Sequence, residues 1–453
     1  MSDSYLCIIM GKFEEFIIAN AGEDTSRLLL SNKEWPRPED PRLSDIPVKH
    51  LAVNTIEARK KLCKKVPEWY SRTDLVYPTT LCAEQCSSSE TARYKASVAR
   101  RISGISGGPV HRIADLTGGL GIDSWAFSEC FDEVLYNEMD TALASAAAHN
   151  YEALGVKNVR VVNQEVSPSS LSGVLGGFGP DVIFLDPARR SSSGKKVFLL
   201  EDCRPDVLAL LPGLLSVCRH LLLKLSPMAD IQLVTEQLDK AYEVFLEKDA
   251  GSGWNGRWVR EVHVVSSGGE CKELLVWMDR EWNDGYSLVC REDGGILEFT
   301  PGEIAGAKAS YPDSTYMRYL FEPGKSLTKA GVFNAVCGRF SLVKLARFTH
   351  LYTFPEVMTD DEVLQRSQEL LKFGKLFKIK ELLPLKRSSM KEISKKYPLS
   401  EVTARNIPLS SEELRGKMGV GSGDDAHIFG VRIETPYDSG NYLIACERML
   451  PGE

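Results

Sequence analysis

The sequence predicts an α/β protein whose central domain is a parallel β-sheet with helices on both faces. From residue 111 to about residue 246, short apolar runs typical of buried strands alternate with helical stretches. The loops between them are short, and the first is rich in glycine. This alternation is the pattern that parallel sheets produce. A mainly helical region precedes the domain, and a mixed α+β region follows it.

The first 100 residues are expected to be mostly helical. Residues 56–62 combine helix-forming residues with helical apolar spacing. Residues 87–90 (Ser-Ser-Ser-Glu) resemble a capping box, so a helix should begin there and continue to Arg101. The glycines in residues 104–108 are expected to end it.

The central domain follows with strands and helices in turn. The expected strands are residues 111–116, 133–137, 159–163, 181–185 and 220–225, and the expected helices are residues 123–130, 140–154, 201–217 and 231–246. A terminal hairpin is expected from residues 259–266 and 272–278, across the glycines of the intervening turn. Beyond it, strands are expected at residues 286–289 and 295–299 and helices at residues 328–336 and 362–372.

Composition excludes several classes of protein. The formal net charge of −7 excludes a generally basic, non-specific nucleic-acid binder but leaves room for local basic patches. No uninterrupted apolar run is long enough for a membrane span, and no signal peptide is recognisable, so a cytoplasmic protein without membrane contact is expected. The 11 cysteines are scattered. Cys82 and Cys86 have no second pair at suitable spacing, so we expect no metal site.

A glycine-rich turn follows the first expected strand, in the segment Asp115-Leu-Thr-Gly-Gly-Leu-Gly-Ile-Asp123. Glycines let a ligand approach the backbone at a helix N-terminus. A dinucleotide fingerprint needs a third glycine, where this chain has Ser124. Asp115 could instead accept a hydrogen bond from the ammonium group of S-adenosylmethionine. The alternative is a tight turn that binds nothing. The other candidate cofactor-binding residues of the segment are Thr117, Gly119, Gly121 and Asp123.

Polar residues end the next two strands. Glu138 follows the second strand, where an acidic side chain can bind both ribose hydroxyls; alone, such a residue is more often solvated. Asn163 and Gln164 end the third strand, where an amide could bind the adenine edge. The alternative is that both are ordinary turn residues.

Asp186 and Pro187 follow the fourth strand, and ligands of open α/β sheets bind at such carboxyl ends. The Asp186 carboxylate and the Pro187 carbonyl could accept hydrogen bonds from the exocyclic amine of a base. Methyl transfer from a sulfonium is an in-line displacement that depends mainly on alignment. The alternative is an ordinary Asp-Pro turn. Arg189 and Arg190 are either phosphate contacts or exposed charges.

These motifs together resemble the class I S-adenosylmethionine-dependent methyltransferases. Residues 115–121 resemble their first motif, Glu138 their acidic second-strand residue, and residues 186–189 their fourth motif. Within the class, the chain resembles bacterial members whose C-terminus carries a THUMP-like domain, a module associated with RNA binding. That resemblance rests on residues 91–96, 224–227, 319–323 and 400–406.

The resemblance implies a Rossmann-like methyltransferase sheet, S-adenosylmethionine as cofactor and RNA, either tRNA or rRNA, as partner. It also implies a division into a helical region (1–100), a methyltransferase domain (101–280), a ferredoxin-like region (281–370) and a THUMP-like domain (371–453). The modified nucleotide and the oligomeric state are not implied.

Two departures from the family pattern bear on the acceptor. Ala188 and Arg189 stand where many amino-methyltransferases carry a proline and a stacking aromatic residue. Ser226, rather than a nucleophilic cysteine, follows the fifth strand, so a covalent mechanism is not expected. Lys224 is a charged residue in that apolar strand and either extends to the surface or lines the acceptor site. Direct methylation of a base nitrogen is the expected reaction, with Lys224 and Ser226 among the substrate-binding residues.

Residues 371–405 are strongly basic, with ten Lys or Arg residues against three Glu. They also contain Phe373, Phe377 and Tyr397, and basic residues with aromatics suit contact with RNA. Lys395 and Lys396 are therefore candidate RNA contacts, although a solvated helix face is the usual alternative. Two other functions stay open: methylation of a protein or small metabolite, with the C-terminal region as a lid, or RNA binding without catalysis.

Overall fold

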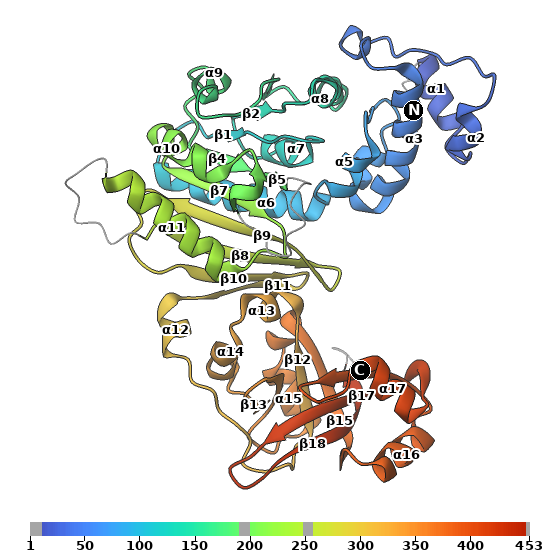
Figure 1. The fold of residues 1–453 in the computed structure, drawn as a ribbon, viewed down its shortest axis with the longest axis vertical. Helices are drawn as coiled ribbons and strands as arrows, with labels where there is room; N and C mark the ends of the chain where they lie inside the picture. The colour runs from blue at the N-terminus through green and yellow to red at the C-terminus, as the bar shows by residue number, and fades with distance from the viewer. Residues whose placement is uncertain (1–10, 190–199, 248–256, 450–453) are drawn as a thin grey trace, which may run out of the picture. The chain divides into compact units, whose positions relative to one another are not determined.

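The computed structural model describes residues 11–189, 200–247 and 257–449, and these fall into two compact units. The first unit comprises Met1–Arg260 and Leu275–Asp284, and the second Glu261–Leu274 and Gly285–Glu453 (Figure 1). Arg190, a predicted phosphate contact, lies outside the described residues.

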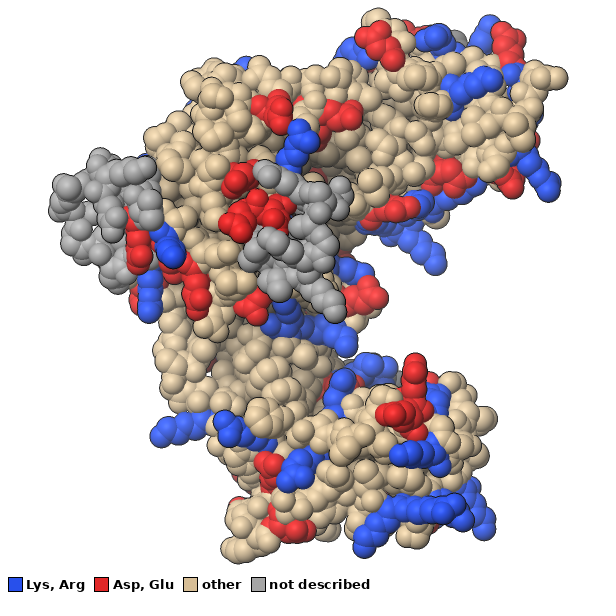
Figure 2. All heavy atoms as spheres, viewed as in Figure 1, with Lys and Arg blue, Asp and Glu red and all other residues tan. Residues whose placement is uncertain are grey.

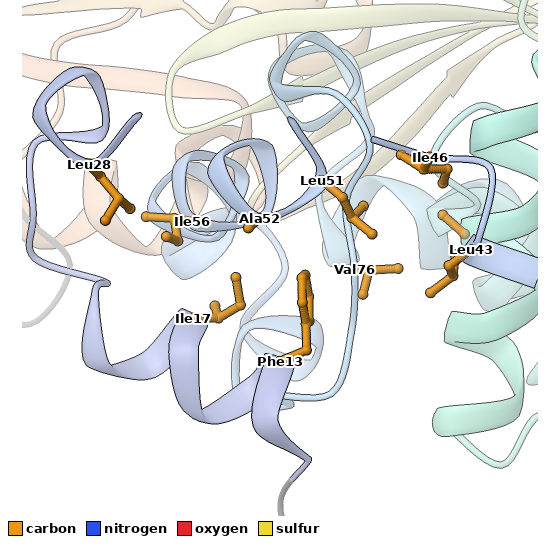
Figure 3. Packing of buried hydrophobic residues seen from close by; sticks show 10 residues of the cluster. Phe13, Ile17, Leu28, Leu43, Ile46, Leu51, Ala52, Ile56 and Val76 are labelled. Atoms are coloured by element: carbon orange, nitrogen blue, oxygen red, sulfur yellow. The ribbon is translucent and has the colours of Figure 1, made fainter. Parts of the chain in front are cut away.

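The N-terminal region is helical, as expected. Its helices are α1 (Lys12–Ala19), α2 (Thr25–Leu29), α3 (Val48–Lys65), α4 (Pro67–Tyr70), α5 (Thr80–Gln85) and α6 (Ser89–Ser106). Figure 3 shows Phe13 and Ile17 of α1 directed toward Leu51 and Ile56 of α3. These side chains are almost completely buried and form a hydrophobic core to which Ala146 of the central domain also contributes.

Helix α6 begins with a capping box that is shifted by one residue from the expected one. The Ser88 hydroxyl accepts a hydrogen bond from the Thr91 backbone N–H at 3.2 Å, and the Thr91 hydroxyl accepts one from the Ser88 N–H at 3.1 Å. The glycines of residues 104–108 end the helix as expected: it passes through Gly104 and ends at Gly107, whose φ is +72°. One glycine inside a helix costs only about 1 kcal/mol, so a long helix tolerates it.

The expected parallel sheet lies in the first unit. Strands β1 (Arg112–Asp115), β2 (Glu133–Asn137), β3 (Val159–Val162), β4 (Val182–Leu185) and β7 (His220–Leu225) run parallel in the order β7-β4-β1-β2-β3. The connecting helices are α7 (Ile122–Ser128), α8 (Thr141–Ala153), α9 (Leu171–Leu175), α10 (Val207–Val217) and α11 (Ile231–Glu247). This order brings the ends of β1, β2 and β4 to one edge of the sheet.

The helix expected at residues 201–217 begins only at Val207. Pro205 explains the difference, because proline lacks an N–H and disfavours a helical conformation in the residue before it. Residues 200–204 instead form a 3-10 turn, η2 (Leu200–Asp202), and a short strand, β6 (Cys203–Arg204), which pairs with β5 (Ala188–Arg189). Asp206 then caps α10 by accepting a hydrogen bond from the Ala209 N–H at 3.1 Å.

The expected hairpin is present as β8 (Val259–Ser267) and β9 (Glu270–Asp279), and the boundary between the two units runs through it. Gly268 and Gly269 both have positive φ, as a two-residue hairpin turn requires. The hairpin does not end the pairing. Strand β10 (Ser287–Glu292) runs parallel to β8, and β11 (Gly295–Phe299) runs antiparallel to β10.

The second unit also contains a mixed sheet in the order β13-β14-β12-β15-β18-β17-β16. Its strands are β12 (Tyr319–Pro323), β13 (Val343–Ala346), β14 (Thr349–Thr353), β15 (Gly374–Pro384), β16 (Leu399–Arg405), β17 (Gly421–Glu434) and β18 (Ser439–Met449). Its helices are α12 (Pro301–Gly306), α13 (Lys325–Ala330), α14 (Phe333–Phe340), α15 (Asp360–Arg366), the 3-10 turn η3 (Leu370–Phe373), α16 (Arg387–Lys396) and α17 (Ser411–Met418).

Two expected helices of this unit are each divided into two elements. The stretch 328–336 is split between α13 and α14, because Gly331 adopts a φ of +71° and ends the first helix. The stretch 362–372 becomes α15 and η3. Phe373 and Phe377 were expected to contact RNA, but both are buried, Phe377 in the hydrophobic core of the sheet, so this expectation was wrong.

Candidate cofactor and acceptor site

Asp115, at the end of β1, organises the glycine-rich loop. Asp115 is only 1% exposed. One of its carboxylate oxygens accepts a hydrogen bond from the Thr117 N–H at 3.1 Å, and the other accepts one from the Ser124 hydroxyl at 2.7 Å. Burial raises the pKa of Asp115 to about 7, helped by the nearby Asp123 and Asp186 and opposed by the bond from Ser124. Ser124, which replaces the third glycine of a dinucleotide fingerprint, therefore binds the loop's own carboxylate.

The glycines of the loop have different reasons to be glycine. A Cβ at Gly118 would overlap the ring of Tyr136, and a Cβ at Gly121 would lie 2.5 Å from the Tyr151 hydroxyl. Gly119 has a φ of +54°, and no atom lies within 4 Å of the position that its Cβ would take. Gly119 is thus the glycine that leaves space for a ligand, whereas the packing of two tyrosines requires the other two.

Those two tyrosines were not identified from the sequence. The Tyr136 hydroxyl donates to the Gly119 carbonyl at 2.6 Å, and the Tyr151 hydroxyl donates to the Gly121 carbonyl at 2.9 Å. Both rings are buried, and burial raises the pKa of each phenol well above its ordinary value. They therefore act as neutral hydrogen-bond donors that fix the loop from behind.

Glu138 and the loop are in direct contact, as the predicted cofactor site requires. One carboxylate oxygen accepts from the Gly119 N–H at 2.8 Å, and the other accepts from the Asp140 N–H at 2.8 Å. The preceding residue, Asn137, is buried and donates through its amide to the Leu116 carbonyl at 3.2 Å and the Gln164 carbonyl at 3.0 Å. Asn137 was missed by sequence reasoning, yet it joins the loops that follow three strands.

Asn163 and Gln164 follow β3 and are both exposed. The Asn163 amide donates to the Glu138 carbonyl at 2.7 Å, and its oxygen accepts from the Thr141 hydroxyl at 3.0 Å. Asn163 thus lies beside Glu138. A contact of either amide with adenine stays a prediction.

Asp186 is joined to the glycine-rich loop through its backbone. Its N–H donates to the Thr117 hydroxyl at 2.6 Å, while its carboxylate, 36% exposed, forms an ion pair with Lys224 of β7. The Lys224 side chain is only 11% exposed, so it pairs with Asp186 and does not extend into solvent. A contact of Lys224 with a substrate stays a prediction.

The remaining predicted acceptor residues lie close to Asp186 or Lys224 in the sequence. Pro187 is buried, and Ser226 is exposed and accepts from the Met228 N–H at 3.2 Å. Arg189 lies in β5, but its side chain is outside the described residues. Their roles in binding a substrate stay predictions.

Asp123 belongs to a buried ionic cluster that connects the loop to the N-terminal region. Its carboxylate accepts from the Ser87 hydroxyl at 2.9 Å and lies 3.2 Å from the Lys95 ammonium. Lys95 is completely buried on α6 and also donates to Ser87 at 2.9 Å. These contacts account for a buried carboxylate at residue 123 without a cofactor, so the predicted contact of Asp123 with the cofactor stays a prediction. Removing one partner of a buried pair is costly, which makes α6 part of the loop's support.

Lys395 and Lys396 lie on α16 of the second unit, and both are exposed. Lys396 pairs with Glu381 at 2.9 Å. Figure 2 shows Lys and Arg side chains gathered over α16. The expected basic surface is therefore present, without the two buried phenylalanines.

Comparison with known proteins agrees with this architecture. A structure from Porphyromonas gingivalis W83, described there as a candidate methyltransferase, is 28% identical, with a TM-score of 0.76, and the match covers 97% of this chain and 98% of that one. The fold is that of a methyltransferase. Family models further match a ferredoxin-like domain at residues 319–360 and a THUMP-like domain at residues 374–448, so the chain combines these three parts.

Two other solved structures match less than half of this chain. The Thermus thermophilus 16S rRNA N2 G1207 methyltransferase is 17% identical over 42% of this chain and 43% of its own, with a TM-score of 0.27. A human methyltransferase 10 domain containing protein is 14% identical over 44% of this chain and 87% of its own, with a TM-score of 0.30. Neither bears on function. No curated protein matches the sequence. Across the described ranges, no helix has the length and apolar character to cross a membrane.

Proposed function

We propose that the protein is an S-adenosylmethionine-dependent methyltransferase that methylates a base nitrogen of structured RNA, tRNA or rRNA, by direct in-line transfer. One observation carries the proposal. The Gly119 N–H binds Glu138, the predicted ribose ligand, and the Thr117 hydroxyl binds the backbone of Asp186, the predicted acceptor ligand. The same glycine-rich loop therefore holds both Glu138 and Asp186 and sets the distance between the proposed cofactor and acceptor positions. In-line methyl transfer depends mainly on this alignment.

The residues present suit S-adenosylmethionine. The open space at Gly119 lets a ligand approach the backbone, and the Glu138 carboxylate is the group that binds ribose hydroxyls in nucleotide folds. The buried Asn137 side-chain oxygen has no hydrogen-bond partner among the described residues, so it can still accept a hydrogen bond. When bound, the cofactor supplies a methyl group activated by its sulfonium.

Asp186 and Lys224 act on the acceptor in this proposal. The Asp186 carboxylate accepts a hydrogen bond from the exocyclic amine of the base and so orients the nitrogen. Lys224 holds that carboxylate in place through the ion pair. The Pro187 carbonyl is a second acceptor. Arg189 and Arg190 contact phosphates of the RNA, and Ser226 lies beside the substrate.

Binding of S-adenosylmethionine is expected to strengthen as the pH rises toward about 7 and then to level off. Asp115 is protonated below that pH because burial raises its pKa to about 7. In this proposal Asp115 contacts the ammonium group of S-adenosylmethionine, which favours the ionised carboxylate. Binding therefore releases a proton, and the affinity for the cofactor rises by up to about tenfold per pH unit below the pKa of Asp115. The same raised pKa makes the ionised form costly in the free protein, so the contribution of Asp115 to stability falls as the pH rises from 3.8 to about 7.

Calorimetry between about pH 5.5 and pH 8.5 tests this dependence. Asp115→Asn is the matched control, because an amide can keep both hydrogen bonds, to the Thr117 N–H and to the Ser124 hydroxyl. The variant should lose the pH dependence that comes from the protein and keep that of the cofactor's own amine. Identical profiles for the two proteins would remove Asp115 from the proposed contact.

The THUMP-like domain and the basic surface of α16 support RNA as the partner. Charge reversal at Lys395 and Lys396 is expected to weaken RNA binding and to reduce the slope of log affinity against log salt by about one unit for each phosphate that the protein no longer neutralises. Gel shifts of bulk tRNA at several salt concentrations measure this slope. The control is Lys272→Glu, which makes the same charge change at an exposed residue of β9. An unchanged slope would exclude these two lysines from the interface.

Transfer of a labelled methyl group separates the proposal from its two rivals. The acceptor is RNA isolated from a strain that lacks the protein, and protein and small-metabolite fractions of the same strain are assayed beside it. Label in RNA that requires the enzyme supports the proposal. Label only in the other fractions favours the protein or metabolite rival. Absence of S-adenosylmethionine binding in calorimetry favours an RNA-binding protein without catalysis.

A further inference from the structure

A cavity of about 470 Å³ lies wholly within the second unit, lined by residues that the proposed methyl transfer does not use. It is bounded by the start of α14, by β13, by the turn to β14 and by α12 with the segment after it. Such a volume is typical of a pocket for a small ligand. The residues on which the argument depends are Tyr311, Phe333, Lys344, Arg347, Phe348 and His350. Among the described residues that line the cavity, none is Asp or Glu.

Part of the lining suits an anion. Lys344 is only 3% exposed; its ammonium donates to the Arg347 carbonyl at 2.9 Å and lies 3.5 Å from the Asn334 side-chain oxygen. Burial lowers the pKa of Lys344, as it does for an ammonium without a carboxylate partner. Helix α14 begins beside it at Phe333, with no side-chain cap, so its first backbone N–H groups add the positive end of a helix dipole.

Arg347 adds a second cation to the lining of the cavity. Its guanidinium lies over the ring of Phe348, 5.2 Å from the centroid. The nearby Glu434 accepts a hydrogen bond from the Arg347 backbone N–H at 3.1 Å and one from Arg432 at 3.0 Å, and it is not part of the lining. The cavity itself therefore presents cations to a ligand.

Aromatic side chains also line the cavity. The rings of Phe333 and His350 stack with centroids 3.5 Å apart and an interplanar angle of 11°. Burial, together with Lys344, lowers the pKa of His350 to about 4, so the ring is neutral at pH 7. Its Nδ1 is buried and has no hydrogen-bond partner among the described residues. Two more rings are accessible, Tyr311 at 37% and Phe348 at 65%.

We infer that this cavity binds a nucleotide unit, with its phosphate beside Lys344 and the start of α14 and its base against Tyr311 and Phe348. Single-stranded nucleic acids are held in this way, by stacking of bases on aromatic rings and by cations on the phosphates. The unit is either an unpaired nucleotide of an RNA strand or a free nucleoside monophosphate, since both offer the same chemistry. The inference does not depend on methyl transfer.

Calorimetry on the full chain tests the inference with three probes: inorganic phosphate, uridine 5′-monophosphate and a short oligouridylate. The oligouridylate is measured in the Lys395→Glu, Lys396→Glu background, so that binding at α16 does not contribute. The nucleotide is expected to bind more tightly than phosphate. Phe348→Ala and Lys344→Met should each weaken nucleotide binding by about tenfold or more, while Lys272→Met, on exposed β9, should not.

The outcomes are distinct. Tighter binding of the oligouridylate than of the monophosphate identifies an RNA strand as the source, and equal binding identifies a free nucleotide; either supports the site. Failure of both probes to bind overturns the inference, as does binding that neither variant weakens. Phe348 is exposed, so its variant tests the site even if Lys344→Met unfolds, which thermal melting would reveal.

Discussion

Alanine at Asp186 is expected to lower the rate of methyl transfer by about two to four orders of magnitude while leaving S-adenosylmethionine binding within about threefold of wild type. The carboxylate that the substitution removes contacts Lys224, not the cofactor loop. The contact to the loop is made by the Asp186 backbone N–H with the Thr117 hydroxyl, and alanine keeps it. The glycine-rich loop and the backbone at residue 186 therefore stay in place, while the methyl acceptor loses the carboxylate that orients it.

Single-turnover transfer of labelled methyl groups to RNA, with calorimetry of the cofactor on the same preparations, measures both quantities. Lys224→Met is the companion variant, since it leaves Asp186 in place but removes the ion pair. Its expected loss is smaller, about tenfold, because the carboxylate is misdirected rather than absent. An Asp186→Ala enzyme that transfers methyl groups at a rate near that of wild type would exclude Asp186 from the reaction.

Alanine at Gly118 is expected to destabilise the protein by about 3 kcal/mol or more and to abolish cofactor binding. The new Cβ would overlap the ring of Tyr136. That ring is completely buried and its hydroxyl holds the Gly119 carbonyl, so neither the ring nor the loop has room to move. The midpoint of urea unfolding and calorimetry with S-adenosylmethionine measure the two effects.

Gly119→Ala is the matched control, one residue further along the same loop. No atom lies near the position of its Cβ, so the expected destabilisation is only the cost of about 1 kcal/mol that a positive φ imposes on alanine. The variant should stay folded and bind S-adenosylmethionine more weakly, because the methyl group enters the space left for the ligand. Equal stability of the two variants would show that the packing of Tyr136 does not require a glycine at residue 118.

Local sequence patterns predicted most of the first sheet. The bounds of β2 and β7 agree with the expected residues, because each strand is a short buried run between polar residues or turn signals. The pattern failed where one residue changes the backbone. Pro205 delays the start of α10, and Gly331 divides the helix expected at residues 328–336.

The sequence also placed the candidate residues at strand ends, but it could not reveal which of them meet. The pair of Asp186 and Lys224 depends on β4 and β7 being neighbours, which follows from the strand order and not from spacing along the chain. The same holds for Lys95 and Asp123, which belong to consecutive parts of the chain but meet only through packing of α6 against α7.

Charge and aromatic content were less reliable guides to the C-terminal region. The excess of Lys and Arg in residues 371–405 correctly indicated a basic surface on α16. Phe377 was misassigned because β15 directs it into the core of the sheet, and a single aromatic residue in a basic stretch does not show which face it occupies. The division at residues 100, 280 and 370 stays a prediction.

The most direct test of the proposed function is mass spectrometry of nucleosides from tRNA and rRNA of a strain that lacks the protein. Three strains are compared with it: the parent, one complemented with the wild-type protein and one complemented with Asp186→Ala. We predict that one methylated nucleoside disappears in the deletion strain, returns with the wild-type protein and does not return with the variant. The same content of every methylated nucleoside in the parent and the deletion strain would contradict RNA methylation.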